Sequence, residues 1–132
     1  KKYYMNKITF TLSLITLIIF SGCQESLEER CARELKEHTA KNCPVYIDKF
    51  TIQDSAVYEA NTHTIHYYYT LEGAADNRNL VSNARSVLIE QLRNTTAMRA
   101  YKENGFNFQY TYRSASGDSI LTSIRLTEKD YK

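Results

Sequence analysis

His63 and His66 are the two side chains whose type and spacing come closest to a metal site. The run His63-Thr64-Ile65-His66 places two imidazoles three positions apart. Structural zinc sites need four such ligands, and no cysteine, histidine or carboxylate cluster with a known metal-binding spacing accompanies this pair. The segment also has the composition of a strand, on which residues three apart point to opposite faces of the sheet. We therefore expect no metal site and no cofactor here.

Asp54 and Ser55 are the candidates for hydrolytic chemistry. Together with a distant histidine they supply the residue types of a catalytic triad, but no nucleophile-elbow motif surrounds Ser55. A serine beside an aspartate is typical of a turn. The four glycines form neither of the spacings found in nucleotide-binding loops. The sequence predicts a protein that has no catalytic residues and is not an enzyme.

An apolar segment near the start of the chain predicts export. Lys7 supplies a positive charge, residues 8–20 are apolar apart from threonine and serine, and the small residues Ser21 and Gly22 follow. This order is typical of a secretory signal peptide. The apolar run is shorter than the roughly 20 residues that a membrane-spanning helix needs. An uncleaved membrane anchor and a signal peptide cut at another position are the alternatives.

The last residues of this segment, Phe20-Ser21-Gly22-Cys23, resemble the lipobox of bacterial lipoprotein precursors, with Phe20 where that family usually has leucine. The resemblance implies that residues 1–22 are a signal peptide, and that Cys23 carries membrane lipid. Residues 23–132 are then one small lipid-anchored domain. Gln24, rather than aspartate, after the cysteine resembles the sorting pattern that favours the outer membrane. The expected location is the bacterial cell envelope.

The predicted mature chain is close to electrical neutrality. Removal of residues 1–22 takes away three of the 17 lysines and arginines and none of the 15 acidic residues. Nucleic-acid binding needs clustered basic side chains that neutralise phosphates, and the mature chain has no basic run. We expect no nucleic acid among its partners.

Cys31 and Cys43 remain as an even pair once Cys23 is assigned to lipid. Disulfides persist outside the cytosol, and a small domain gains stability from one. We expect a disulfide between Cys31 and Cys43, and two unpaired thiols are the alternative.

The hydrophobic pattern predicts an α+β fold with the element order α-β-β-α-β-β. Helices are expected at residues 24–40, where Ser26 and Glu29 fit a capping box, and at residues 80–103, with an interruption at residues 94–96. Strands are expected at residues 45–58, 64–71, 106–113 and 120–126. Two hairpins separated by a helix predict a four-stranded, mainly antiparallel sheet with the long helix on one face.

Cys43-Pro44 and Gly105-Phe106, at the expected strand entrances, resemble small uncharacterised α+β envelope proteins of bacteria. The chain holds 11 tyrosines and no tryptophan. Tyrosine and arginine are favoured at protein interfaces, although ordinary packing within the sheet is the simpler interpretation of these tyrosines. We expect the sheet face away from the helix to bind a protein partner, and its candidate residues are His66, Tyr68, Gln109 and Arg113.

The predicted function is that of a non-enzymatic, lipid-anchored envelope protein that binds another envelope protein. The alternative is an envelope enzyme or small-ligand-binding protein with a pocket between helix and sheet. A purely structural domain of a larger complex is a third hypothesis.

Overall fold

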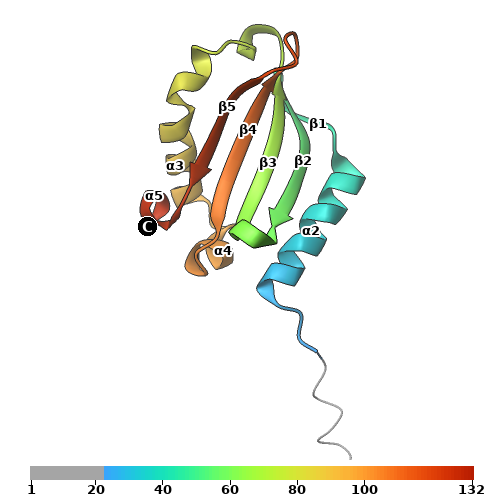
Figure 1. Ribbon diagram of the computed structural model, residues 1–132, viewed down its shortest axis with the longest axis vertical. Coiled ribbons are helices and arrows are strands. Elements are labelled where there is room, and N and C mark those ends of the chain that lie inside the picture. The colour runs from blue at the N-terminus through green and yellow to red at the C-terminus, as the bar shows by residue number, and fades with distance from the viewer. Residues whose placement is uncertain (1–22) are drawn as a thin grey trace, which may run out of the picture.

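The structure, a computed structural model, describes residues 23–132. The predicted signal peptide, residues 1–22, lies outside the described residues. One sheet of five strands forms the centre of the domain, and helices flank it on two sides (Figure 1). Between residues 23 and 132, no helix is long and apolar enough to cross a membrane.

The elements follow one another along the chain as short helices and strands, with η marking 3-10 helices. They are α2 (Leu27–Asn42), β1 (Val45–Asp48), β2 (Thr51–Glu59), η1 (Ala60–Thr62), β3 (Thr64–Leu71), η2 (Gly73–Ala75), η3 (Leu80–Asn83), α3 (Ala84–Asn94), α4 (Arg99–Glu103), β4 (Asn107–Ser114), β5 (Ile120–Leu126) and α5 (Glu128–Tyr131).

The first helix begins at the predicted capping box. The Glu29 backbone amide donates to Ser26 Oγ at 3.1 Å, and the Ser26 amide donates to Glu29 Oε2 at 3.0 Å. These two bonds satisfy amides that a helix start would otherwise leave unpaired. Pro44 follows the helix end closely, and the residue before a proline avoids helical geometry. The capping box is confirmed.

The sheet differs from the prediction in strand number and in the central pairing. Its order is β1-β2-β3-β4-β5, and β3 pairs with β4 in parallel while the other three pairs are antiparallel. The expected strand at residues 45–58 is interrupted at Lys49 and Phe50, where Asp48 Oδ1 accepts the Phe50 amide at 2.8 Å. The long connection from β3 to β4 allows the parallel pairing. The α+β class is confirmed, and the four-stranded description is wrong.

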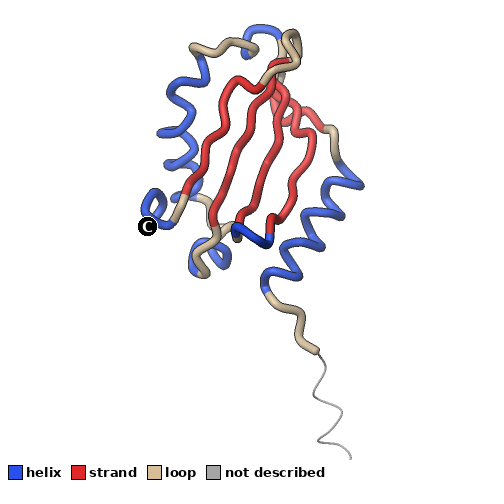
Figure 2. The backbone as a smooth tube through the Cα atoms, viewed as in Figure 1, coloured by secondary structure: helices blue, strands red, loops and turns tan. Residues whose placement is uncertain are grey.

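Side chains of α2, α3 and α4 pack against one face of this sheet. Figure 2 shows α2 and α3 along opposite edges of the sheet, and α4 at the end where β4 begins. Cys31 of α2 and Leu88 of α3 lie in the same buried cluster as Ile65, Phe108 and Leu126 of the strands. The side chains that alternate with these strand residues point to the opposite face. The helices therefore pack on the same face as the core, and within residues 23–132 no helix packs on the other face.

Thr39 attaches α2 to the edge of the sheet. Strand β1 pairs only with the first part of β2, so the outer edge of β2 is unpaired beyond Gln53. Thr39 Oγ1 accepts the Ala56 amide and donates to the Ala56 carbonyl, both at 2.9 Å. One hydroxyl thus satisfies both backbone groups of a fully buried residue.

The predicted interruption of the second long helix is confirmed. Helix α3 ends at Asn94 and α4 begins at Arg99. Thr95 Oγ1 donates to the Gln91 carbonyl at 2.7 Å, and Lys102 Nζ donates to the Leu92 carbonyl at 2.7 Å. The Gln91 carbonyl also accepts the Thr95 amide at 3.0 Å, and Lys102 Nζ donates to the Arg93 carbonyl at 3.0 Å as well. The lysine thus binds carbonyls of the last helical turn, and the break has its own hydrogen bonds.

The predicted disulfide between Cys31 and Cys43 is wrong. Both cysteines are unpaired, one within α2 and the other just after its last residue. A helix rises about 1.5 Å per residue, so the two Cα atoms lie roughly 18 Å apart. A disulfide requires Cα atoms within about 7 Å. The helix that carries Cys31 therefore also prevents the bridge.

Candidate partner-binding surfaces

Four tyrosines form a continuous surface on the face of the sheet against which the helices pack, here named the tyrosine floor. Tyr67 and Tyr69 come from β3, and Tyr110 and Tyr112 come from β4. The parallel register places Tyr67 beside Tyr110 and Tyr69 beside Tyr112. Their ring centroids lie 5.4 and 5.1 Å apart with nearly parallel planes. In-register parallel pairing therefore builds a two-by-two stack of aromatic rings.

The phenol hydroxyls of the tyrosine floor are available as hydrogen-bond donors. Tyr67 Oη lies 4.0 Å from Met98 Sδ, and within residues 23–132 the other three hydroxyls have no hydrogen-bond partner. Since no buried side-chain polar atom in this part of the chain is unsatisfied, those three hydroxyls reach solvent. Burial of the rings raises the pKa of Tyr67 and Tyr112 to about 12, and it also raises the pKa of Tyr69 and Tyr110. All four phenols stay protonated at neutral pH.

A cavity of about 300 Å³ adjoins the tyrosine floor between α2, β3 and α4. Its apolar lining includes Cys31, Leu35, Ile65 and Met98. Burial raises the pKa of the Cys31 thiol to about 11, so this cysteine is protonated and poorly nucleophilic. This cavity corresponds to the pocket between helix and sheet that the alternative hypothesis predicted. Its cysteine, Cys31, is not an activated nucleophile.

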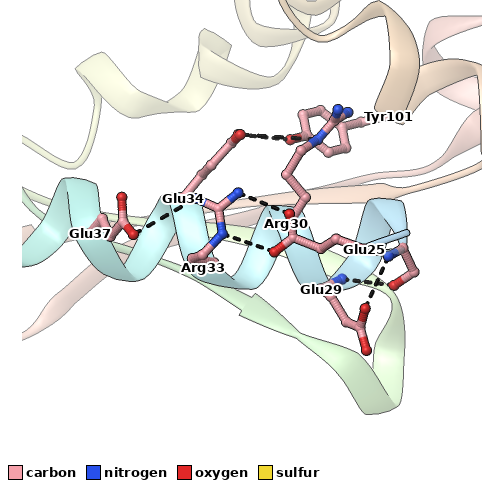
Figure 3. Close-up of polar contacts among 8 residues, drawn as sticks. Glu25, Glu29, Arg30, Arg33, Glu34, Glu37 and Tyr101 are labelled. Atoms are coloured by element: carbon pink, nitrogen blue, oxygen red, sulfur yellow. Dashed lines mark hydrogen bonds and ion pairs between the residues drawn. The ribbon is translucent and has the colours of Figure 1, made fainter. Parts of the chain in front are cut away.

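Charged side chains form the rim of this cavity. Tyr101 Oη donates to Glu34 Oε2 at 3.4 Å, and Arg30 Nε lies 4.0 Å from Glu34 Oε1. Figure 3 shows these contacts joining α2 to Tyr101 of α4. The entrance therefore offers a guanidinium and a carboxylate above an apolar interior.

The four residues predicted to bind a partner share the face of the sheet opposite the core. His66 and Gln109 are register partners on β3 and β4. His66 is 7% exposed, with Nδ1 2.7 Å from Glu59 Oε1 and Nε2 2.7 Å from Thr111 Oγ1. Tyr68 stacks on its ring with a centroid distance of 4.0 Å. His66 is thus held by the protein's own groups, and Tyr68 is the more accessible of the two.

Arg113 and Tyr68 line a second cavity, of about 490 Å³, on this polar face. Arg113 pairs with Asp118, and Gln109 Nε2 donates to Ser123 Oγ at 3.0 Å. Asp54 also lines the cavity, and its Oδ2 accepts from Thr70 rather than from a histidine. The binding role of His66, Tyr68, Gln109 and Arg113 stays a prediction.

His63 lies just before β3, as the cap residue of η1, so the two histidines do not share a strand, contrary to the expectation from the sequence. His63 adopts a left-handed conformation with φ of 52°, and its ring nitrogens contact Tyr58 Oη at 2.9 Å and the Asn104 carbonyl at 3.2 Å. These bonds tie η1 to the turn before β4. In the described part of the chain, no group of three or more potential ligands is placed to hold a metal ion.

Cys23, the predicted lipid attachment site, is exposed at the start of the described chain. It precedes the first residue of α2 by four positions. The side chain is therefore accessible to modification, and its lipidation stays a prediction.

Comparison with family models matches residues 26–122 to the Domain of unknown function (DUF8479). The chain belongs to this family. The match extends from the α2 cap into β5, so it includes both candidate surfaces. A search of curated proteins found no match.

Three solved structures share the fold at low sequence identity. A candidate secreted protein of Pseudomonas aeruginosa has a TM-score of 0.62 and 15% identity, over 83% of this chain and 100% of that chain. The type II secretion system pilotin AspS of Vibrio cholerae has a TM-score of 0.57 and 11% identity, over 79% and 91% of the two chains. The type 2 secretion system pilotin EpsS of Vibrio vulnificus has a TM-score of 0.57 and 14% identity, over 80% and 92%. At these identities the likeness concerns the fold alone.

Sequence reasoning missed the tyrosine floor because it did not pair β3 with β4. The signal is present in the alternation, since Tyr67 and Tyr69 share the face of Ile65, and Tyr110 and Tyr112 share the face of Phe108. Only the parallel register brings the two pairs together.

Proposed function

We propose that this protein is a lipid-anchored, non-enzymatic protein of the bacterial cell envelope, in the outer membrane, that binds another envelope protein. The tyrosine floor is the observation that carries the proposal. It combines apolar rings with solvent-reaching hydroxyls, and this combination gives tyrosine its strong contribution to protein interfaces. The fold shared with two secretion-system pilotins supports a role as an accessory protein of a secretion system.

The occupant that fits this surface best is an amphipathic segment of the partner. Its apolar side would contact the tyrosine rings and the adjoining cavity, and its polar groups would meet the free hydroxyls and the charged rim at Arg30 and Glu34. Peptide recognition commonly takes this form, in which apolar anchors enter a groove and polar groups at its rim set specificity.

The polar sheet face is the second surface that we propose for the partner. Its support is the cavity beside Tyr68 and Arg113, whose tyrosine and guanidinium can contact a protein surface together. His66 and Gln109, which are register partners on β3 and β4, complete this surface beside Tyr68.

Two neighbouring positions in β3 allow an experiment to distinguish between the two surfaces. Tyr68 and Tyr69 are adjacent in β3, so their side chains point to opposite faces of the sheet. A photo-reactive residue at position 69 in one variant and at position 68 in another, used in cells, places the probe on each face in turn. An envelope protein cross-linked from position 69 alone assigns the tyrosine floor, and one from position 68 alone assigns the polar face. No partner from either position overturns the binding proposal.

A small-ligand-binding role is the second candidate function, and the cavity between α2, β3 and α4 favours it. Ala97 lines this cavity, so Ala97→Leu would fill part of its volume. Native mass spectrometry of the purified protein would detect a retained ligand. A ligand present in the wild type and absent from Ala97→Leu would support this role, and a ligand-free wild type would argue against it.

A further inference from the structure

Glu25, just before α2, forms a two-pronged ion pair with Arg33 in the second turn of this helix. Arg33 Nε donates to Glu25 Oε1 at 2.8 Å, and Arg33 Nη2 donates to Glu25 Oε2 at 2.9 Å (Figure 3). The hydrogen bond from Arg33 lowers the pKa of Glu25, so the carboxylate is ionised at neutral pH. Parallel bonds of this kind fix direction as well as distance. The residues before α2 are therefore held against its first two turns.

The capping box adds a second constraint directly beside this pair. Ser26 exchanges two hydrogen bonds with Glu29, which fixes the residue that follows Glu25. Among the described residues, Cys23 and Gln24 make no hydrogen bond, so they are the free part of the link between Cys23 and the domain. A link this short differs from the long, hydrated tether that many surface domains have.

These constraints limit how far the domain can stand from Cys23. The four residues from Cys23 to Ser26 span at most about 14 Å when extended. The 16 residues of α2 are about 24 Å long, since a helix rises about 1.5 Å per residue. Figure 1 shows η1 and α4 at the end of the domain where α2 begins, while η2 and the β4–β5 turn lie at the opposite end.

We propose that the domain stands end-on against a lipid bilayer, with η1 and α4 facing the headgroups and η2 pointing away from them. The inference rests on the lipidation of Cys23 in the proposed function. Glu25, Arg33 and Ser26 act as positioning residues: their bonds fix the direction in which the chain leaves α2 towards the lipid on Cys23. In this orientation the tyrosine floor and the polar sheet face both open sideways, parallel to the membrane, so a partner approaches along the membrane surface.

The absence of tryptophan from the sequence allows a direct measurement. Asn61→Trp in η1 and Ala74→Trp in η2 each introduce one fluorescent reporter at an exposed position, at opposite ends of the domain. Each lipidated variant is purified from membranes and placed in phosphatidylcholine vesicles that contain a headgroup spin-labelled lipid. The expected result is several-fold stronger quenching for Asn61→Trp than for Ala74→Trp. Equal quenching of the two reporters overturns the proposal.

The role of the ion pair has its own matched control. Glu25→Ala removes the two-pronged partner of Arg33 and leaves its 3.7 Å contact with Glu37 in place. Glu28→Ala removes a carboxylate in the first turn of α2 that makes no ion pair within residues 23–132. Glu25→Ala should bring the quenching of the two reporters closer together, and Glu28→Ala should leave their ratio unchanged. An unchanged ratio in Glu25→Ala would remove the positioning role from this pair.

Failure of the underlying function gives a different result. Mass spectrometry of the membrane-purified protein measures the acyl mass on Cys23, and flotation measures vesicle binding. Protein without acyl mass that stays behind on flotation overturns the lipid anchor itself and the orientation with it. Acylated protein that floats but shows equal quenching overturns the orientation alone.

Discussion

Replacement of Thr39 tests the attachment of α2 to the sheet. Thr39→Val keeps the shape of the side chain and removes the hydroxyl that binds both backbone groups of Ala56. Valine and threonine have similar helix propensities, so the helix itself should change little. The variant should lose the two hydrogen bonds and leave an amide and a carbonyl of a fully buried residue without partners.

The expected cost follows from these two unpaired groups. A lost hydrogen bond that leaves a buried partner unsatisfied costs about 1–3 kcal/mol. Partial access of water at the edge of β2 reduces this figure, so we expect the free energy of unfolding to fall by about 2–4 kcal/mol for the pair of groups. With a urea m-value of about 2 kcal/mol/M, the midpoint should fall by roughly 1–2 M.

Urea unfolding of residues 23–132, followed by circular dichroism, measures this change. Thr39→Ser is the matched control, because it keeps the hydroxyl and removes only a methyl group. It should unfold close to the wild type. A Thr39→Val midpoint within about 0.25 M of the wild type, at an unchanged m-value, would show that this hydroxyl does not hold α2 to the sheet.

Three further predictions concern buried side chains. The Cys31 thiol, whose pKa burial raises to about 11, should resist alkylation at pH 8 in the folded protein and react quickly in denaturant; rapid reaction of the folded protein would contradict its burial. The raised pKa values of Tyr67 and Tyr112 should make the free energy of unfolding fall as pH rises from 10 towards about 12, because the unfolded chain loses these phenol protons first. An ultraviolet titration in which every tyrosine ionises near pH 10 would refute this prediction. Tyr131→Phe removes the 2.7 Å hydrogen bond to the Phe106 carbonyl and should lower the free energy of unfolding by about 1–3 kcal/mol, whereas a urea midpoint equal to that of the wild type would argue against this bond.

Local features of the fold were predictable because short-range physics decides them. The cap at Ser26 depends on residues three apart, and the strand at residues 64–71 agrees with β3 at both ends. The interruption near Thr95 follows from poor helix formers in sequence. Each of these features needs only neighbours along the chain.

Features that depend on partners distant in sequence were not predictable in the same way. Alternation in β3 and β4 specifies which side chains share a face, but not that the two strands lie side by side in parallel. The division of β1 from β2 was missed because Lys49 and Phe50 carry no glycine or proline signal for a turn. The disulfide error was avoidable, since Cys31 already lay on the expected helix and the helical rise separates it from Cys43.

The binding residues were predicted only as far as the pattern of the sheet allows. The alternation correctly places His66 and Tyr68 on one face of β3, opposite Tyr67 and Tyr69. It does not show that Glu59 and Thr111 occupy both nitrogens of His66, because those contacts come from other strands. Composition therefore pointed to tyrosine as a candidate interface residue, and the structure shows that tyrosines lie on both faces of the sheet.

The parallel pairing of β3 and β4 has a consequence for the order of folding. The β2–β3 and β4–β5 hairpins are local in sequence, so each can form before distant parts of the chain meet. Residues 72–106 must close as one long loop before the two hairpins can join. We expect this joining to limit the folding rate, with α3 and its connections forming the bridge between two preformed halves. The tyrosine floor then assembles only in the last step, when its two halves arrive on different hairpins.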